Sequence, residues 1–289
     1  MAIDATDSAA AAGTLTLGGD LEVRRLGFGA MRLTREGIWG PPKDRETAKG
    51  VLRRAVELGV DFIDTADSYG PAVSEEVIAE ALHPYPGGLV IATKGGFTRS
   101  GPGEWNPDGR PEHLREACEG SLRRLRLERI DLYQFHTVDP DVPFEESVGT
   151  LVELQDEGKI GHIGLSNVDA HQLARAREIV PIVSVQNRYS IEVRDSEPVL
   201  EECEVHGIAF IPWYPLAAGN LAGGGTIARI AEAHDATPSQ VAIAWLLARS
   251  PLMLPIPGTS SVEHLEENVA AAGLRLAQEE FEELFASGG

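Results

Sequence analysis

Residues 61–70 read Asp-Phe-Ile-Asp-Thr-Ala-Asp-Ser-Tyr-Gly, a short apolar run that passes directly into a cluster of polar residues. The run Phe62–Thr65 does not alternate between apolar and polar residues, which is typical of a strand buried on both faces of a parallel sheet. The preceding segment Arg45–Glu57 places its apolar residues at helical spacing. This stretch therefore predicts a helix, a buried strand and a polar loop in succession.

The same unit recurs along the whole chain. Further buried strands are predicted at Arg25–Gly29, Leu89–Thr93, Leu132–His136, Ile163–Ser166, Ile182–Gln186, Ala209–Trp213 and Leu252–Pro255. Helices are predicted at Pro111–Leu125, Val142–Glu157, Asp169–Glu178, Glu197–His206, Pro238–Ser250 and Val262–Ala272. Eight such strands favour closure into an α/β fold of the (β/α)8 barrel type, and 289 residues suit one barrel of typically ~250 residues.

A doubly wound open sheet is the alternative architecture. Its dinucleotide fingerprint needs three glycines, whereas Gly27-Phe28-Gly29-Ala30-Met31-Arg32 ends in arginine. The fingerprint is therefore absent, and the barrel is favoured.

The N-terminal region has a different pattern. Residues 14–23 predict a β-hairpin around Gly18–Gly19. Residues 1–13 contain an alanine run and neither a basic start nor a strong apolar core, so we expect a disordered leader. No composition shift marks a later boundary, and residues 14–289 are expected to form a single barrel domain.

The composition excludes several classes of function. There are 45 acidic and 25 basic residues, giving a net charge of −20, which argues against nucleic-acid binding and against a basic membrane-surface protein. No apolar stretch approaches the ~20 residues that span a bilayer. Two cysteines provide neither a disulfide framework nor a cysteine-based zinc site. We expect a cytoplasmic protein with no bound metal.

Polar residues follow the ends of three neighbouring strands: Asp64 and Tyr69, then Lys94, then His136. Each is consistent by itself with ordinary loop packing, but in a barrel all four reach the rim where active sites lie. A phenol near an ammonium can donate a proton to a carbonyl oxygen, because the ammonium lowers the phenol pKa. Asp64 would pair with Lys94, His136 would orient the carbonyl, and a nicotinamide would supply hydride.

Several motifs together resemble the aldo-keto reductases. They are residues 61–70, Thr93-Lys94, the strand Leu132–His136, Gly164-Leu165-Ser166-Asn167, Val185-Gln186-Asn187, Trp213-Tyr214-Pro215-Leu216, and Ile256-Pro257-Gly258-Thr259 through Glu267-Asn268. The resemblance runs in order from the hairpin to the last helix. It implies a barrel whose bottom is closed by the N-terminal hairpin, with an extra C-terminal helix, and NADPH as cofactor, with NADH possible.

The resemblance also implies roles for individual residues. Asp64, Tyr69, Lys94 and His136 match the catalytic tetrad of the family. Ser166, Asn167 and Gln186 would bind the nicotinamide carboxamide, with Trp213 or Tyr214 stacking on the ring. The remaining cofactor contacts would come from Gly29, Met31, Pro215, Leu216, Gly219, Gly258, Thr259, His264, Glu267 and Asn268. Many relatives have lysine and arginine in place of Gly258 and His264, and both cations would contact the 2′-phosphate of NADPH.

The substrate is less well specified by the sequence. Phe28, Trp39 and Trp105 fall near the expected rim and would form aromatic walls for a flat carbonyl compound, although Trp39 and Trp105 could equally pack only their own loops. The segments Gly37–Pro42 and Pro257–Ser261 resemble a bacterial subgroup that includes pyridoxal reductases, which suggests pyridoxal as a test substrate. The resemblance also leaves open an NADP(H)-binding regulatory subunit with little turnover. A monomer or weak homo-oligomer is expected.

Overall fold

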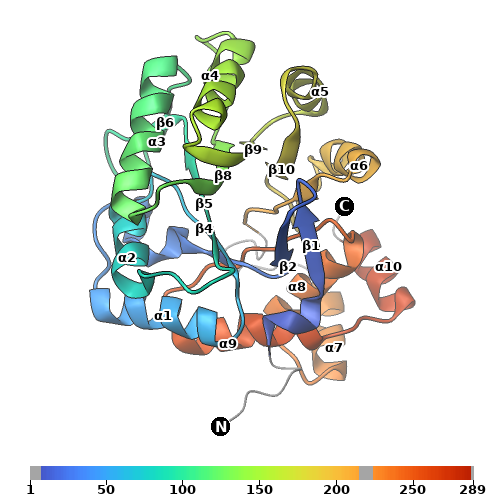
Figure 1. Cartoon of the computed structure of the whole chain (residues 1–289). Helices are drawn as coiled ribbons and strands as arrows, with labels where there is room; N and C mark the ends of the chain where they lie inside the picture. The colour runs from blue at the N-terminus through green and yellow to red at the C-terminus, as the bar shows by residue number, and fades with distance from the viewer. Residues whose placement is uncertain (1–7, 215–223, 288–289) are drawn as a thin grey trace.

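The computed structural model describes residues 8–214 and 224–287, and its centre is a parallel sheet (Figure 1). Seven strands of the described chain follow the order β11-β10-β9-β8-β5-β4-β3. Their bounds are β3 Phe28–Gly29, β4 Phe62–Asp64, β5 Val90–Gly95, β8 Ile130–Phe135, β9 Ile160–Ser166, β10 Ile182–Gln186 and β11 Ala209–Phe210.

The predicted run Leu252–Pro255 takes the eighth place without forming a regular strand. On one side, the Phe210 amide donates to Leu252 O and the Leu254 amide donates to Phe210 O, both at 2.9 Å. On the other side, the Gly27 amide donates to Pro255 O at 2.9 Å, immediately before β3. The sheet therefore closes on itself, which confirms the α/β barrel.

Helices alternate with the strands and surround them (Figure 1). Their bounds are α1 Arg45–Glu57, α2 Val73–Leu82, α3 Pro111–Leu125, α4 Phe144–Asp156, α5 Ala170–Ile179, α6 Glu197–His206, α7 Gly224–Ala233, α8 Pro238–Arg249, α9 Val262–Ala270 and α10 Gln278–Ser287. Helices α1, α3 and α6 have the predicted bounds, and α10 is the expected C-terminal helix. Helix α2 has no capping signal in the sequence, because its N-cap residue Ala72 provides no side-chain acceptor.

The N-terminal hairpin of β1 (Thr14–Leu17) and β2 (Leu21–Arg24) closes the bottom of the barrel. Leu17 and Val23 are buried in one cluster with residues from the beginnings of several barrel strands, among them Phe62, Val90 and Val183. The hairpin therefore fills the end of the barrel opposite the carboxyl ends of the strands.

The expectation of a disordered leader over residues 1–13 is wrong for its second half. Residues Ala9–Ala12 form a 3-10 helix whose N-cap is Ser8, and Ala9 is fully buried. The Ala9 amide donates to Leu58 O at 3.0 Å, which ties the segment to the end of α1. The small alanine side chains allow this close packing. An uninterrupted alanine run has no apolar–polar periodicity, so the sequence gives no signal of the structured turn.

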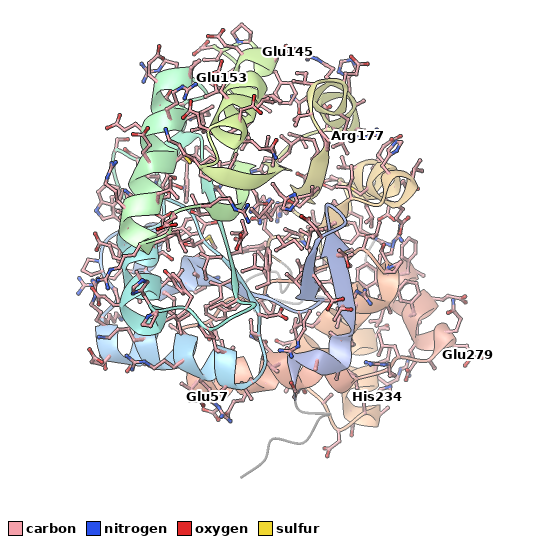
Figure 2. All side chains as sticks on the ribbon, viewed as in Figure 1. Glu57, Glu145, Glu153, Arg177, His234 and Glu279 are labelled. Carbon is pink, nitrogen blue, oxygen red and sulfur yellow. The ribbon has the colours of Figure 1, made fainter. Side chains whose placement is uncertain are left out.

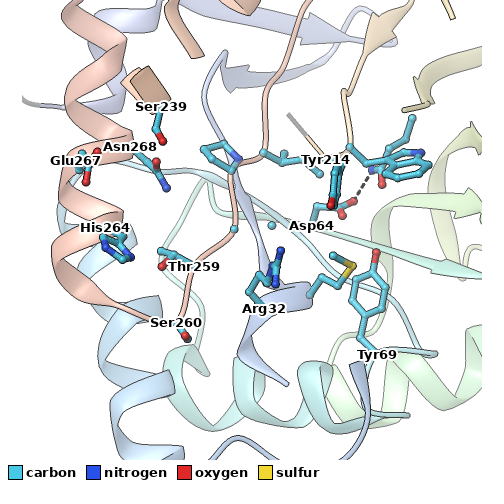
Figure 3. Close-up of a pocket in the computed structure, with 17 residues that line it drawn as sticks. Arg32, Asp64, Tyr69, Tyr214, Ser239, Thr259, Ser260, His264, Glu267 and Asn268 are labelled. Carbon is cyan, nitrogen blue, oxygen red and sulfur yellow. Dashed lines mark hydrogen bonds between the residues drawn. The ribbon is translucent and has the colours of Figure 1, made fainter. Parts of the chain in front are cut away.

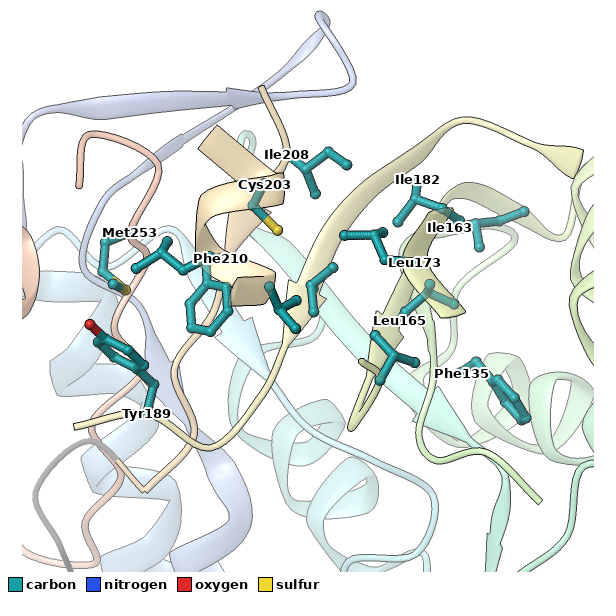
Figure 4. Close-up of a cluster of buried hydrophobic side chains, with 14 of the residues drawn as sticks. Phe135, Ile163, Leu165, Leu173, Ile182, Tyr189, Cys203, Ile208, Phe210 and Met253 are labelled. Carbon is teal, nitrogen blue, oxygen red and sulfur yellow. The ribbon is translucent and has the colours of Figure 1, made fainter. Parts of the chain in front are cut away.

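Most of the core lies between the outer faces of the strands and the helices. Figure 4 shows one part of it, which includes Phe135, Leu165 and Phe210 from three strands together with Leu173 of α5 and Cys203 of α6. Charged side chains such as Glu57, Glu145, Glu153 and Glu279 extend from the periphery (Figure 2). None of the helices described here has both the length and the apolar character needed to cross a bilayer.

Candidate active site

The four rim residues come together at the carboxyl ends of adjacent strands. Asp64 is the last residue of β4, Lys94 lies near the end of β5, and His136 directly follows β8. Parallel pairing aligns these ends, with Asp64 beside Ala92 and Lys94 beside Gln134. Tyr69 extends from the loop after β4, and all four residues are at most 6% exposed.

Lys94 links the group. Its ammonium donates to Asp64 Oδ1 at 2.6 Å, to Thr65 O at 2.8 Å and to the Tyr69 hydroxyl at 3.4 Å. Burial alone would lower the pKa of Lys94, but the charges and hydrogen bonds of Asp64 and Tyr69 together raise it above its ordinary value. Lys94 is therefore a charged donor directed at the phenol oxygen.

The pKa of Tyr69 differs from the sequence expectation. Burial raises it above its ordinary value, and this effect exceeds the lowering by Lys94, whose charge is partly offset by Asp64. The predicted lowering by the ammonium is present but is not the dominant contribution. Tyr69 therefore carries its proton at neutral pH and can act as an acid toward a stronger base such as an alkoxide.

His136 is held as a neutral ring. Burial, followed by the charges of Lys94 and Arg99, lowers its pKa well below the ordinary value. Its Nδ1 lies 3.4 Å from Ser68 Oγ, and its ring packs edge-on against Tyr69 with centroids 5.9 Å apart. A neutral imidazole next to the phenol can contribute one hydrogen bond to a carbonyl oxygen without adding charge.

Asp64 is held from its other side by two amides. Gln134 and Gln186 donate to Asp64 Oδ2 at 3.0 and 2.8 Å. Gln134 was missed by the sequence analysis, although its polar side chain in the apolar strand β8 was a usable signal. Gln186, expected to bind the nicotinamide carboxamide, here donates to the carboxylate of Asp64. These amides offset the cost of burying the charge of Asp64.

A cleft of about 470 Å³ opens beside this group (Figure 3). Tyr69 and Asp64 lie at one end, and His264, Glu267 and Asn268 from α9 lie at the other. The predicted cofactor residues that line it are Gly29, Met31, Gln186, Trp213, Tyr214, Gly258, Thr259, His264, Glu267 and Asn268. Its volume is within the ~300–1,000 Å³ typical of ligand sites.

The other predicted cofactor residues divide into two groups. Ser166 and Asn167 do not line the cleft but adjoin it, since Asn167 Oδ1 accepts a hydrogen bond of 3.0 Å from the Trp213 indole. This bond fixes the indole beside the tetrad. Pro215, Leu216 and Gly219 lie outside the described residues.

Arg32, which no sequence motif marks as a site residue, also lines the cleft. It follows β3, and in Figure 3 it lies between Tyr69 and the α9 residues. A Cβ on Gly258 would overlap the carbonyl oxygen of Gly29 and lie 3.6 Å from Arg32 Cγ. The backbone contact excludes a side chain at position 258, and Arg32 brings a positive charge to the same region. Proximity of an arginine from another loop could not be predicted from local sequence.

The predicted aromatic substrate residues do not share one environment. Phe28 is fully buried in a cluster with Val51 of α1 and Ile78 of α2, so its prediction as a pocket residue is wrong. It points to the helix layer because it lies on the outward face of β3. Trp105 instead packs edge-on against Tyr69 and His136, with ring centroids 6.3 and 6.2 Å apart.

Comparison with known proteins agrees with this geometry. Residues 25–287 match the model of the Aldo/keto reductase family. An uncharacterized oxidoreductase of Schizosaccharomyces pombe is 52% identical over 284 residues, covering 98% of this chain and 91% of that protein. Pyridoxine 4-dehydrogenase of Escherichia coli is 44% identical over 272 residues, covering 92% and 95%. The crystal structure of an aldo/keto reductase from Klebsiella pneumoniae in complex with NADP and acetate has a TM-score of 0.79 at 28% identity, covering 94% and 93%.

Proposed function

Because this chain belongs to the aldo/keto reductase family, we propose that it reduces an aldehyde or ketone to an alcohol, with hydride from NADPH and a proton from Tyr69. The observation that carries the proposal is the buried hydrogen-bonded series of Tyr69, Lys94 and Asp64 at one end of the cleft. Membership of this family makes the protein an oxidoreductase.

The cleft fits a nicotinamide dinucleotide. Trp213 and Tyr214 provide aromatic rings at the tetrad end, and Thr259 and His264 lie at the entry of α9, where helix amides favour anions. When bound, the reduced nicotinamide supplies the hydride that reaches the carbonyl carbon. The NADP complex of the Klebsiella relative supports this cofactor for the present chain.

The tetrad performs the proton transfer. Tyr69 donates its hydroxyl proton to the carbonyl oxygen as negative charge develops there, and Lys94 stabilises the resulting phenolate. Asp64 keeps Lys94 in place, and neutral His136 orients the carbonyl oxygen beside the phenol. In the reverse direction, the phenolate would accept the alcohol proton.

The pH dependence follows from these pKa directions. The depressed pKa of His136 leaves it uncharged, and the raised pKa of Tyr69 leaves it protonated. We expect the chemical step of carbonyl reduction, measured under single-turnover conditions, to be flat between about pH 6.5 and 9. Alcohol oxidation should accelerate with pH because it requires the phenolate. A reduction rate that falls with an apparent pKa near the ordinary value of histidine would contradict this assignment.

Arg32 is expected to bind a phosphate group of the cofactor, in place of the lysine that many relatives have at position 258. Arg32→Gln should raise the Kd for NADPH about tenfold or more, because charge-assisted hydrogen bonds to phosphate are strong. Arg32→Lys should retain part of the affinity that Arg32→Gln loses. Fluorescence titration with NADPH and NADH measures the effect. Weakening of NADPH alone assigns Arg32 to the 2′-phosphate, and equal weakening of both assigns it to the diphosphate. Unchanged affinities would exclude either contact.

Pyridoxal is the first substrate to test, because the Escherichia coli relative is named as a pyridoxine 4-dehydrogenase. Pyridoxal and a panel of aromatic and aliphatic aldehydes should consume NADPH absorbance. A nucleotide-binding regulatory subunit is the second candidate, and it would bind NADPH without appreciable turnover of any member of the panel.

A further inference from the structure

Arg99 joins three loops around the tetrad through its guanidinium group. It directly follows β6 (Phe97–Thr98), in a small hairpin completed by β7 (Asn106–Pro107). Its N–H groups donate to the main-chain carbonyl oxygens of Glu104 (2.6 Å), Gly37 (2.8 Å), Ser68 (3.0 Å), Ile38 (3.1 Å) and Gly101 (3.4 Å). A guanidinium has five N–H groups, and five carbonyls accept from it here.

The acceptors come from segments far apart in the chain. Ser68 immediately precedes Tyr69, so one of these bonds fixes the backbone next to the proton donor. Gly37 and Ile38 belong to the loop after β3, and the other two acceptors belong to the hairpin of Arg99. Removing the guanidinium would therefore release all three loops at once.

The backbone at residues 37–38 has a conformation that needs external support. Gly37 has φ 71° and Ile38 has φ 53°. A β-branched residue with positive φ is a rare and unfavourable case, and such strain persists only where the surroundings determine it. The carbonyls of the strained Ile38 and of the adjacent Gly37 both accept hydrogen bonds from Arg99.

Arg99 also supports two tryptophans, Trp39 and Trp105, which we call the aromatic wall. Its Cζ lies 3.7 Å from the ring centroid of Trp105 and 5.7 Å from that of Trp39. Trp105 packs edge-on against both Tyr69 and His136, so the wall adjoins the reacting groups. Arginine stacking on the ring faces holds the wall in one orientation.

We propose that Arg99 is a positioning residue that holds the aromatic wall against Tyr69 and thereby sets selectivity for flat aromatic carbonyl compounds. The proposal rests on the proposed reductase function. Arg99 acts through the loops and not on the substrate, because its N–H groups are all directed at main-chain carbonyls. Because Trp105 packs against Tyr69, an aromatic ring whose carbonyl reaches Tyr69 would lie against this wall, whereas a small aliphatic aldehyde needs no such face.

The test compares Arg99→Met and Arg99→Lys with the unmodified enzyme, using benzaldehyde and propanal. For Arg99→Met we expect kcat/KM for benzaldehyde to fall about 10- to 100-fold, mainly through KM, because misplacement of a positioning wall by about 1 Å has effects of this size. For propanal we expect a change within about threefold, and the Kd for NADPH should be unchanged. Arg99→Lys should retain only part of the kcat/KM for benzaldehyde that Arg99→Met loses, because an ammonium has three donors and no planar stacking face.

Two controls separate positioning from a general structural effect. Arg35→Met replaces an exposed arginine of the neighbouring loop and should leave both substrates unaffected. Trp105→Leu should reproduce the benzaldehyde loss, and its combination with Arg99→Met should lose little more, because residues acting as a unit are not additive.

The loop connection has a readout that does not depend on activity. Trypsin should cleave after Arg35 or Lys43 faster in Arg99→Met than in the unmodified protein, because residues 37–38 lose their support. Equal losses for benzaldehyde and propanal, or none, would overturn the proposal. So would a selective loss on 4-carboxybenzaldehyde relative to benzaldehyde, which would place Arg99 on the substrate. Faster cleavage in a protein that reduces no carbonyl would overturn the proposed function and the selectivity, leaving only the loop connection.

Discussion

Tyr69→Phe should lower kcat/KM for carbonyl reduction by about 10²–10⁴-fold, the usual contribution of a positioned proton donor. The variant removes only the hydroxyl oxygen that lies 3.4 Å from Lys94 Nζ, and the phenyl ring can keep its packing against His136. The Kd for NADPH should remain within about twofold, because the loss is confined to a transition-state interaction. Steady-state assays and fluorescence titration measure the two quantities.

The matched control is Tyr85→Phe. The Tyr85 hydroxyl donates to Leu125 O at 2.8 Å, remote from the cleft, so its removal should leave kcat unchanged. If Tyr69→Phe retained full activity while Tyr85→Phe behaved as expected, Tyr69 would not be the proton donor.

Lys94→Met should lose both activity and stability. Asp64 is 2% exposed and would lose the ammonium now 2.6 Å away, which would leave a buried carboxylate without its ion-pair partner. Breaking a buried ion pair by removing one partner costs about 3–5 kcal/mol. We therefore expect the free energy of unfolding in urea to fall by this amount, together with a loss of kcat comparable to that of Tyr69→Phe.

The double variant Asp64→Asn with Lys94→Met separates the effect of an unpaired Asp64 carboxylate on stability from the loss of the Lys94 side chain. It should recover a large part of the lost stability, because no uncompensated carboxylate remains, but none of the activity. A double-mutant cycle gives the coupling directly. Strictly additive losses of stability would show that the pair is not electrostatically coupled in the folded protein.

The barrel could be predicted from the sequence because its signals are local. Unalternated apolar runs such as Ile182–Gln186 coincide with strands, and α1 has its predicted bounds. The grouping of the four tetrad residues could be predicted because the carboxyl ends of barrel strands meet at one rim. Helix α2 lacked a capping signal, and the structured turn at Ala9–Ala12 depends on contact with Leu58.

The remaining features of the site depend on tertiary contacts or burial. The pKa of Tyr69 could not be inferred from the presence of Lys94, because the direction depends on how completely the phenol is excluded from water. Arg99 was not singled out because its acceptors Ile38 and Ser68 lie 61 and 31 residues away in the chain. The prediction that Phe28 lines the substrate pocket is wrong because its position in the sequence indicates the strand but not the face of the strand on which the side chain lies.

The contact between Gly29 and Gly258 has a consequence for engineering. A Cβ on Gly29 would lie 2.6 Å from Ile256 O, and one on Gly258 would overlap Gly29 O. A mutational step that introduces lysine at position 258 therefore meets a steric barrier before it can provide any charge. A change of coenzyme preference in this protein is therefore better sought by randomising positions 32 and 264 while keeping both glycines.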